Sequence, residues 1–375
     1  MNSTPYTPTR RQVLTAGAGL GAAMALAGCG LGSDTGGAVK ADRAVKAEVD
    51  GDLVYFNWAD YLDPSVLKGF KKKYGVKIIT SNYDSMESMQ AKMSAGNRYD
   101  VIFPSAQWVE KLAAAGQLLR IDHSLVPNST LIFDHYRTFA DPWYDANSAH
   151  SIPFSMYKTG LAWRKDKLGD QLTGSWNDLW NRKAKKQTYL LDDRDEVLGM
   201  LALLLDFPLN TAKPAHLEAM VQKASTLRPY LRGFSSTDYR NLLSGNAWIQ
   251  QTWSGDMAAV LNNADDPSIY GFESPKEGTP VNSDCYAIPA NAAHPGTALL
   301  FINYLLEPEN VIKNMQYIGY PMPVHGTEKA YEKIVADFPE CKVTLSDLSD
   351  ELYFDDGSVA QTRRRSDAWT SIKVG

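Results

Sequence analysis

Aromatic and acidic side chains occur together in several short stretches of this 375-residue chain. The stretch YFNWADYLD places Trp58 and Tyr61 around Asp60, and the stretch TWSGD contains Trp253 and Asp256. Carboxylates attract ammonium groups, and the face of an aromatic ring attracts a cation by about 0.5–2 kcal/mol per contact. Aromatic walls also bury methylene groups, at about 0.8 kcal/mol for each CH2. The pairing therefore favours a guest that is a cation with an apolar stem.

Other side chains of the same kinds follow predicted strands or lie in turns. In open parallel sheets, ligands bind at the carboxyl ends of the strands, where loops lead into helices. Scattered positions of this type can therefore come together in one pocket, which should be open and wet when empty because unpaired buried acids are costly. The further candidates for this pocket are Ser105, Asp193, Glu196, Asp284 and Tyr320.

Asp193 and Glu196 also fit an enzymatic interpretation, because paired carboxylates hydrolyse glycosidic bonds. The sequence has no nucleophile elbow with a plausible base, no HExxH and no glycine-rich phosphate-binding motif. Its six histidines show no spacing typical of a metal site. We therefore predict a binding protein with no catalytic residues, no cofactor and no metal. A carboxylate-dependent extracellular hydrolase is the alternative.

Composition and periodicity indicate a soluble α/β protein. The net charge of -5 argues against a nucleic-acid partner, which usually requires a basic surface. Strand and helix patterns alternate in two regions, as expected for parallel sheets flanked by helices. The predicted strands are 53–57, 76–80, 99–104, 151–154, 159–163, 188–191 and 284–289. The predicted helices are 64–74, 85–95, 108–115, 196–205, 215–227 and 294–306.

The N-terminal segment resembles a bacterial export signal. A twin-arginine pair precedes a run of small apolar residues at 16–27, which is too short to cross a bilayer as a helix. The sequence LAGC then ends at Cys29, as at a lipoprotein cleavage site. We predict a twin-arginine lipoprotein signal peptide at 1–29, lipidation of Cys29 and a flexible tether at 30–50. The alternative is an uncleaved tail with an accidental cysteine.

The remaining cysteines and a cluster of arginines are less informative. Cys285 and Cys341 would be able to form a disulfide in an exported protein, or to remain buried or free thiols, and the sequence leaves both options open. The run of three arginines at 363–365 is predicted to lie on a solvated helix face.

Nine segments occur in the order in which a known family has them. They are YFNWADYLDP, YDVIFPSAQWVEKL, IDHSLVPN, SIPFSMYKTGLAW, SWNDLW, LLDDRDEVLGMLAL, TWSGD, DCYAIPANA and IGYPMP. From about residue 53 to 323 the chain resembles the periplasmic polyamine-binding proteins of ABC importers, the spermidine- and putrescine-binding group of bacterial solute-binding proteins.

The resemblance implies a two-lobed α/β fold in which each lobe is a mostly parallel sheet flanked by helices. The ligand would bind in the cleft between the lobes, which close over it by hinge motion. Crossing strands are expected near 153–160 and 279–285. The expected lobes are 51–155 plus 282–328, and 156–281 plus 329–375.

The resemblance also implies roles for the candidate residues. Aromatic walls are expected from Trp58, Tyr61, Trp253 and Tyr320, Ser105 lies in the family's PS turn, and amine-binding acids are expected at Asp60, Asp193, Glu196, Asp256 and Asp284. Three positions depart from the family pattern, since Asn282 and Gln107 replace residues that are usually or often aromatic, and Ala59 replaces a small hydroxyl residue. The acids favour a putrescine-like pattern and the thinner aromatic wall would admit a longer or differently shaped amine, so the choice between putrescine and spermidine stays open.

From this resemblance we expect an extracytoplasmic lipoprotein that captures a polyamine and delivers it to the permease and ATPase of an ABC importer. It would act as a monomer, anchored to the outer face of the cytoplasmic membrane or located in the periplasm, without a nucleic-acid partner. Another cationic solute bound by the same fold is a further alternative.

Overall fold

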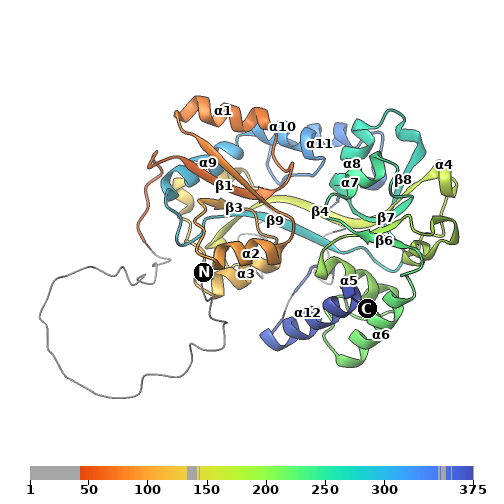
Figure 1. Cartoon of the computed structure of the whole chain (residues 1–375). Coiled ribbons are helices and arrows are strands. Elements are labelled where there is room, and N and C mark those ends of the chain that lie inside the picture. The colour runs from red at the N-terminus through yellow and green to blue at the C-terminus, as the bar shows by residue number, and fades with distance from the viewer. Residues whose placement is uncertain are drawn as a thin grey trace, which may run out of the picture. The chain divides into compact units, whose positions relative to one another are not determined.

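The computed structural model describes residues 43–132, 142, 144–344, 347, 352–355 and 357–374. In this part of the chain, nine strands form one mixed sheet, in the order β2-β1-β3-β9-β4-β7-β5-β6, with β8 paired to β4 (Figure 1). The strands are β1 (Leu53–Trp58), β2 (Ile78–Tyr83), β3 (Val101–Ile102), β4 (Ser151–Arg164), β5 (Thr188–Leu190), β6 (Leu231–Phe234), β7 (Ile249–Trp253), β8 (Tyr270–Glu273) and β9 (Val281–Ala287).

Helices flank the sheet. They are α1 (Pro64–Tyr74), α2 (Met86–Ser94), α3 (Ala106–Ala114), α4 (Lys165–Leu168), α5 (Arg194–Leu204), α6 (Pro214–Ser225), α7 (Asp238–Leu243), α8 (Ser254–Asn263), α9 (Pro295–Leu305), α10 (Pro308–Ile318), α11 (Glu328–Ile334) and α12 (Val359–Val374). The predicted α/β class is confirmed: β1 pairs in parallel with β2 and β3, and β5 pairs in parallel with β6 and β7.

The long strand β4 joins the two parts of the sheet. Its first half pairs antiparallel with β9, and its second half pairs antiparallel with β7 and β8. The strands expected at 151–154 and 159–163 are therefore one continuous strand, and the polar residues between them do not mark a turn. Ser155 and Lys158 in that interval are buried, because the strand crosses the middle of the molecule (Figure 1).

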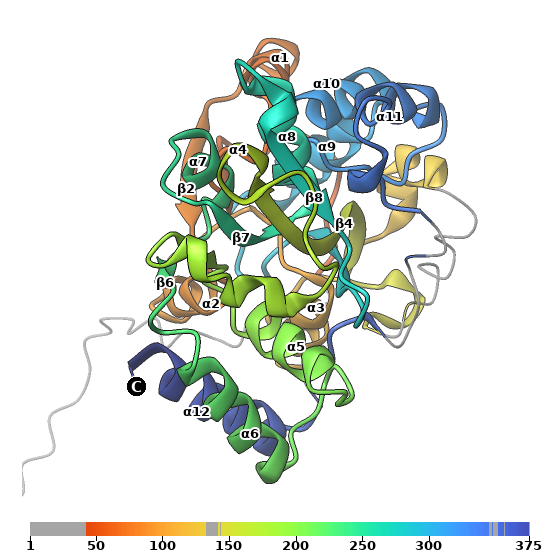
Figure 2. The same cartoon turned by 90° about the vertical axis from the view of Figure 1, so that its right-hand side faces the viewer.

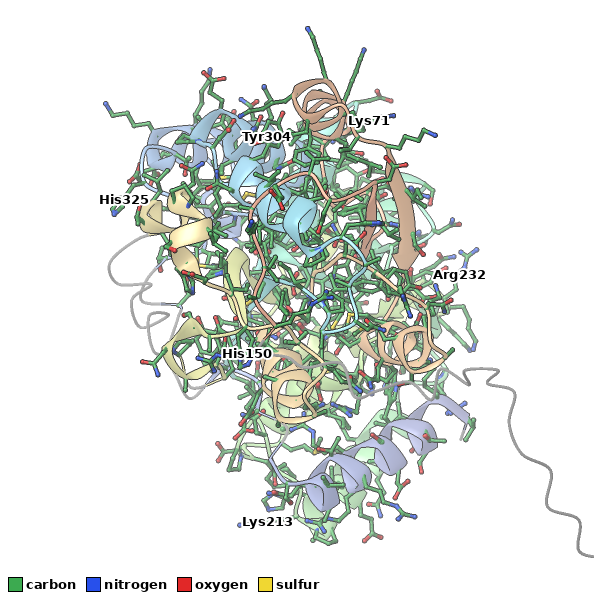
Figure 3. All side chains as sticks on the ribbon, turned by 90° about the vertical axis from the view of Figure 1, so that its left-hand side faces the viewer. Lys71, His150, Lys213, Arg232, Tyr304 and His325 are labelled. Carbon is green, nitrogen blue, oxygen red and sulfur yellow. The ribbon has the colours of Figure 1, made fainter. Side chains whose placement is uncertain are left out.

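Local signals explain why α1 has the predicted bounds. Asp63 accepts a hydrogen bond from Ser65 N at 2.6 Å and caps the first turn, and Pro64 occupies a position where its missing N–H costs nothing. Gly75 ends the helix with a left-handed backbone, φ 71°. Phe70 is buried, whereas the lysines at 71–73 are exposed, and Lys71 extends away from the ribbon in Figure 3.

Two large apolar cores support the two parts of the sheet. One packs α1, α9 and α10 around rings such as Tyr55 and Phe103, whose centroids lie 5.5 Å apart. The other surrounds the fully buried Trp176 and includes α5 and α6. The C-terminal helix α12 lies alongside α6 (Figure 2). Its Arg365 is 1% exposed, so the prediction that residues 363–365 form a solvated face is wrong at this position.

Several N-terminal expectations lie outside the described residues, namely the signal peptide, the lipidation of Cys29 and the first part of the tether. The last tether residues contact the folded body: Asp50 accepts hydrogen bonds from Gly296 N and Thr297 N, both at 2.9 Å, at the start of α9. Cys285 and Cys341 are both buried free thiols. None of the helices in the described ranges is long and apolar enough to cross a membrane. The division of residues between two lobes stays a prediction.

Candidate functional site

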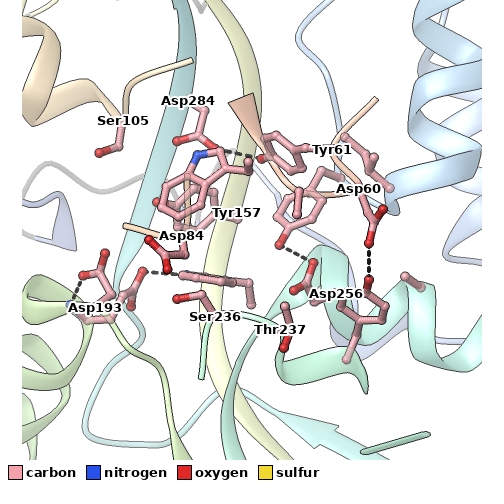
Figure 4. Close-up of a pocket in the computed structure, with 18 of the residues that line it drawn as sticks. Asp60, Tyr61, Asp84, Ser105, Tyr157, Asp193, Ser236, Thr237, Asp256 and Asp284 are labelled. Atoms are coloured by element: carbon pink, nitrogen blue, oxygen red, sulfur yellow. Dashed lines mark hydrogen bonds between the residues drawn. The ribbon is translucent and has the colours of Figure 1, made fainter. Parts of the chain in front are cut away.

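A cavity of about 510 Å³ opens among the loops that follow the strands. The ten residues proposed from the sequence all line it: Trp58, Asp60, Tyr61, Ser105, Asp193, Glu196, Trp253, Asp256, Asp284 and Tyr320. Figure 4 shows acids and rings from different elements pointing into this space. The expected convergence of distant loops is therefore confirmed, while the part that each residue plays in ligand binding stays a prediction.

Asp284 lies at the buried end of the site, on β9. Its Oδ2 accepts a hydrogen bond from the Tyr61 hydroxyl at 2.8 Å, and that hydroxyl also lies 2.8 Å from Ser155 Oγ. Ser105, at the start of α3, pairs with Asp284 through the backbone. Burial raises the pKa of Asp284 to about 7, against the opposing effect of the Tyr61 hydrogen bond. The carboxyl group is therefore partly protonated near neutral pH, and a bound cation would favour its ionised form.

The first turn of α5 supplies two more acids. Asp193 caps this helix by accepting hydrogen bonds from Asp195 N at 2.9 Å and Glu196 N at 3.0 Å. Glu196 Oε1 accepts a hydrogen bond from Trp253 Nε1 at 2.9 Å. Its Oε2 is buried without a donor in the part of the chain that the structure describes, although Thr159 lies close by. Burial, and then the charge of Asp193, raise the pKa of Glu196 well above its usual value. In the described part of the chain, no cation is paired with the buried carboxyl groups at this end of the site, so a bound cation would stabilise their ionised forms.

Aromatic rings connect the acidic ends. Trp58 and Trp253 have their centroids 6.4 Å apart, and Tyr157 lies 6.2 Å from Trp253 and 6.1 Å from Tyr320. Tyr320 in turn lies 5.3 Å from Tyr61. The planes of these pairs meet at 61–90°, so the rings form an edge-to-face series rather than two parallel plates. Such an arrangement presents both ring faces and ring edges to the cavity.

Asp256 marks a third acidic position, at the start of α8. Its Oδ1 accepts a hydrogen bond from the Tyr320 hydroxyl at 2.8 Å, and the buried carboxyl group of Asp238, whose two oxygens have no hydrogen-bond partner in the described part of the chain, lies close enough for the two charges to interact. Asp238 is 1% exposed, and burial and the neighbouring Asp256 raise its pKa well above the usual value. Two acids in contact without a basic partner share a proton more readily than they both ionise.

Asp60 differs from the other acids because it already has partners. Its Oδ2 accepts hydrogen bonds from the Arg240 guanidinium and, at 2.7 Å, from the Tyr239 hydroxyl, both on α7. Among the described residues that line the cavity, Arg240 is the only lysine or arginine. The hypothesis that Asp60 binds an amine therefore requires Arg240 to be displaced or to share the carboxylate.

The sequence hypothesis missed several lining residues. Tyr83 is the last residue of β2, the parallel neighbour of β1, and Asp84 follows it; the strand was predicted to end at residue 80, so these two residues were not placed at the same edge of the sheet. Tyr157 lies inside β4, where no strand end was expected. The other lining residues that were not proposed are Met86, Ser236, Thr237, Tyr239, Arg240, Leu243, Ala259, Asn263, Tyr317, Ile318 and Phe354. Most of these come from α7, α8 and α10, whose positions depend on tertiary packing.

Residues 65–339 match a family model described as "Bacterial extracellular solute-binding protein". The chain belongs to this family. The match covers well over half of the chain, and it confirms the family expected from the nine ordered segments.

Relatives and solved structures of this solute-binding protein agree with that assignment. The spermidine/putrescine-binding periplasmic protein of Escherichia coli (strain K12) is 33% identical over 298 residues, covering 78% of this chain and 84% of the relative. The putrescine-binding periplasmic protein SpuD of Pseudomonas aeruginosa is 29% identical over 92% of this chain and 96% of its own length. A putative spermidine/putrescine ABC transporter structure from Listeria monocytogenes superposes with a TM-score of 0.79 at 28% identity, covering 87% of this chain and 99% of that one.

Proposed function

We propose that this solute-binding protein captures a polyamine, putrescine or spermidine, outside the cytoplasm and delivers it to an ABC importer. The observation that carries the proposal is the charge balance of the cavity. Asp193, Glu196 and Asp284 line it, and no lysine, arginine or histidine among the described residues forms a salt bridge with them, while Arg240 is already paired with Asp60. A linear polycation with methylene spacers supplies the missing charge and covers the rings.

The relatives' names support the same class of guest. The Escherichia coli relative is named for spermidine and putrescine, and the Pseudomonas aeruginosa relative for putrescine. A transport receptor needs no chemistry on its guest, so we propose that the protein is not an enzyme. We also propose export with a lipoprotein signal, anchoring through Cys29 and action as a monomer together with a permease and an ATPase.

Calorimetric titration with putrescine, spermidine and spermine tests the binding proposal. We expect micromolar affinity, about -8 kcal/mol, for at least one of them. No heat with any of the three would refute it. Mass spectrometry of the recovered guest then separates a receptor from a hydrolase, because a receptor returns the amine unchanged. The anchor is tested by comparing membrane and soluble fractions of cells that carry the wild type or Cys29→Ala; equal distribution would refute lipidation.

A further inference from the structure

A line of buried polar side chains runs from the C-terminal helix into the cavity wall. Arg365 on α12 donates to Asp195 Oδ1 at 3.0 Å, and Gln107 Nε2 approaches Asp195 Oδ2 at 3.5 Å. Asn282 Nδ2 then donates to Gln107 Oε1 at 2.9 Å. All four side chains are at most 5% exposed, and Gln107 and Asn282 line the cavity. This amide wall, defined as Gln107 and Asn282, occupies two of the positions at which the sequence departs from the more aromatic family pattern.

The orientation of the amide wall follows from its charged anchor. Asp195 is held by Arg194 through two hydrogen bonds of 2.9 Å as well as by Arg365, so it is ionised and only accepts hydrogen bonds. The amide nitrogen of Gln107 must therefore face Asp195, which leaves its oxygen for Asn282. Asn282 Oδ1 accepts one hydrogen bond, from Ser283 N at 2.8 Å. Each amide oxygen still has one lone pair available.

The amide wall lies between two acidic positions of the cavity. Asn282 precedes Asp284 by two residues on β9, so both side chains lie on the same face of the strand. Gln107 contacts Asp195, which shares the first turn of α5 with Asp193 and Glu196. A linear amine whose ends reach Asp284 and the acids of α5 would therefore pass the amide wall in its middle.

We propose that the amide wall makes this cavity selective for linear triamines, whose internal secondary ammonium donates to the free lone pairs of Gln107 and Asn282, over diamines. The inference rests on the proposed function and specifies its substrate class. A bare methylene chain in the same place leaves two buried amides without their remaining partners, which is costly. A charged donor at that point forms a stronger hydrogen bond than a neutral one.

Three amines of matched chemistry test this inference on the wild-type protein. Spermidine has an internal nitrogen, 1,8-diaminooctane has the same chain length with a methylene group in that position, and putrescine is a shorter diamine. We expect calorimetry to show spermidine binding about tenfold or more tighter than either diamine. Equal affinity for spermidine and 1,8-diaminooctane, or tighter binding of putrescine, would overturn the inference. Absence of binding by every amine would refute the proposed function instead.

A variant assigns the selectivity to the amide wall. Asn282→Leu is expected to reduce the preference for spermidine over 1,8-diaminooctane by about tenfold, mainly by weakening spermidine. Asn310→Leu is the matched control, because Asn310 is also a buried amide, 3% exposed, but does not line the cavity. An unchanged preference in Asn282→Leu would count against the inference. If circular dichroism shows that this variant does not fold, Gln107→Met makes the same test, and the wild-type comparison is decisive by itself.

Discussion

Acidification is expected to weaken polyamine binding, and Asp284 sets the first part of that dependence. Burial raises the pKa of this group to about 7 in the empty cavity. The empty protein therefore holds a proton that the complex, with an ammonium beside the carboxylate, releases. Binding is strongest above pH 8, where the proton is already absent, and is lost as the pH falls through 7. The amine itself stays charged over this range, because alkylammonium groups titrate near pH 10.

The size of the effect follows from the pKa. A carboxyl with a pKa of about 7 that must ionise on binding reduces the apparent affinity by about tenfold for each pH unit below 7. Between pH 8 and pH 5 this amounts to about 100-fold, or about 2.7 kcal/mol, from Asp284 alone. Burial also raises the pKa of Asp193 and of Glu196, so these two acids make the loss steeper.

Calorimetry at pH 8, 7, 6 and 5 measures this dependence, and buffers of different ionisation enthalpy count the protons released. Asp284→Asn is expected to bind more weakly at pH 8 and to lose about one proton of linkage between pH 8 and 5. Asp170→Asn removes an exposed acid outside the cavity and should reproduce the wild-type curve. A dissociation constant that is flat from pH 8 to pH 5, or an unchanged slope in Asp284→Asn, would refute this account of the site.

Three further variants probe other parts of the structure. Trp253→Leu removes a ring and an indole donor from the cavity, and titration should show polyamine affinity lower by about tenfold or more. Arg240→Gln removes the cation that is paired with Asp60, so affinity should rise severalfold at low salt and less at high salt. Arg365→Leu leaves Asp195 with one charged partner fewer in a buried site, and urea unfolding should show a loss of about 3–5 kcal/mol.

The elements that were predicted well are those with local start and stop signals. The helix at 64–74 has a capping acid, an N-terminal proline and a following glycine, and all three act within one turn of the helix end. The position of ligand-facing groups at strand ends was equally accessible, since the topology of a parallel sheet brings those ends to one edge. This rule accounts for Trp58 at the end of β1 and Trp253 at the end of β7, whereas Asp284 lies within the antiparallel strand β9 and Tyr320 follows helix α10.

The misjudged features depend on contacts that are distant in sequence. Separate strands were predicted at 151–154 and 159–163, but β9 pairs along the stretch between them, where Ser155 and Lys158 are buried and Ser155 Oγ contacts the Tyr61 hydroxyl. Arg365 belongs to an apparently solvated basic run, and only the placement of α12 against α5 brings it to Asp195. The pairing of Asp60 with Arg240 joins residues 180 positions apart, so no local pattern indicates it.

One helix turn shows how the protein separates structural acids from acids available to a guest. Asp195 lies between Arg194 and Arg365, which hold its pKa below the usual range despite complete burial. Its charge is balanced within the fold, so it can hold Gln107 in place without attracting a ligand.

Asp193, two residues earlier, has a raised pKa because burial and the charge of Asp195 act on it together. In the described part of the chain, Glu196 keeps one carboxylate oxygen without a hydrogen-bond donor. An unpaired buried charge is far more costly than a paired one. The first turn of α5 therefore has a balanced charge at Asp195 but, among the described residues, lacks a cationic partner at Asp193 and Glu196. No described residue forms a salt bridge with these two acids, and the proposed polyamine would supply that cation.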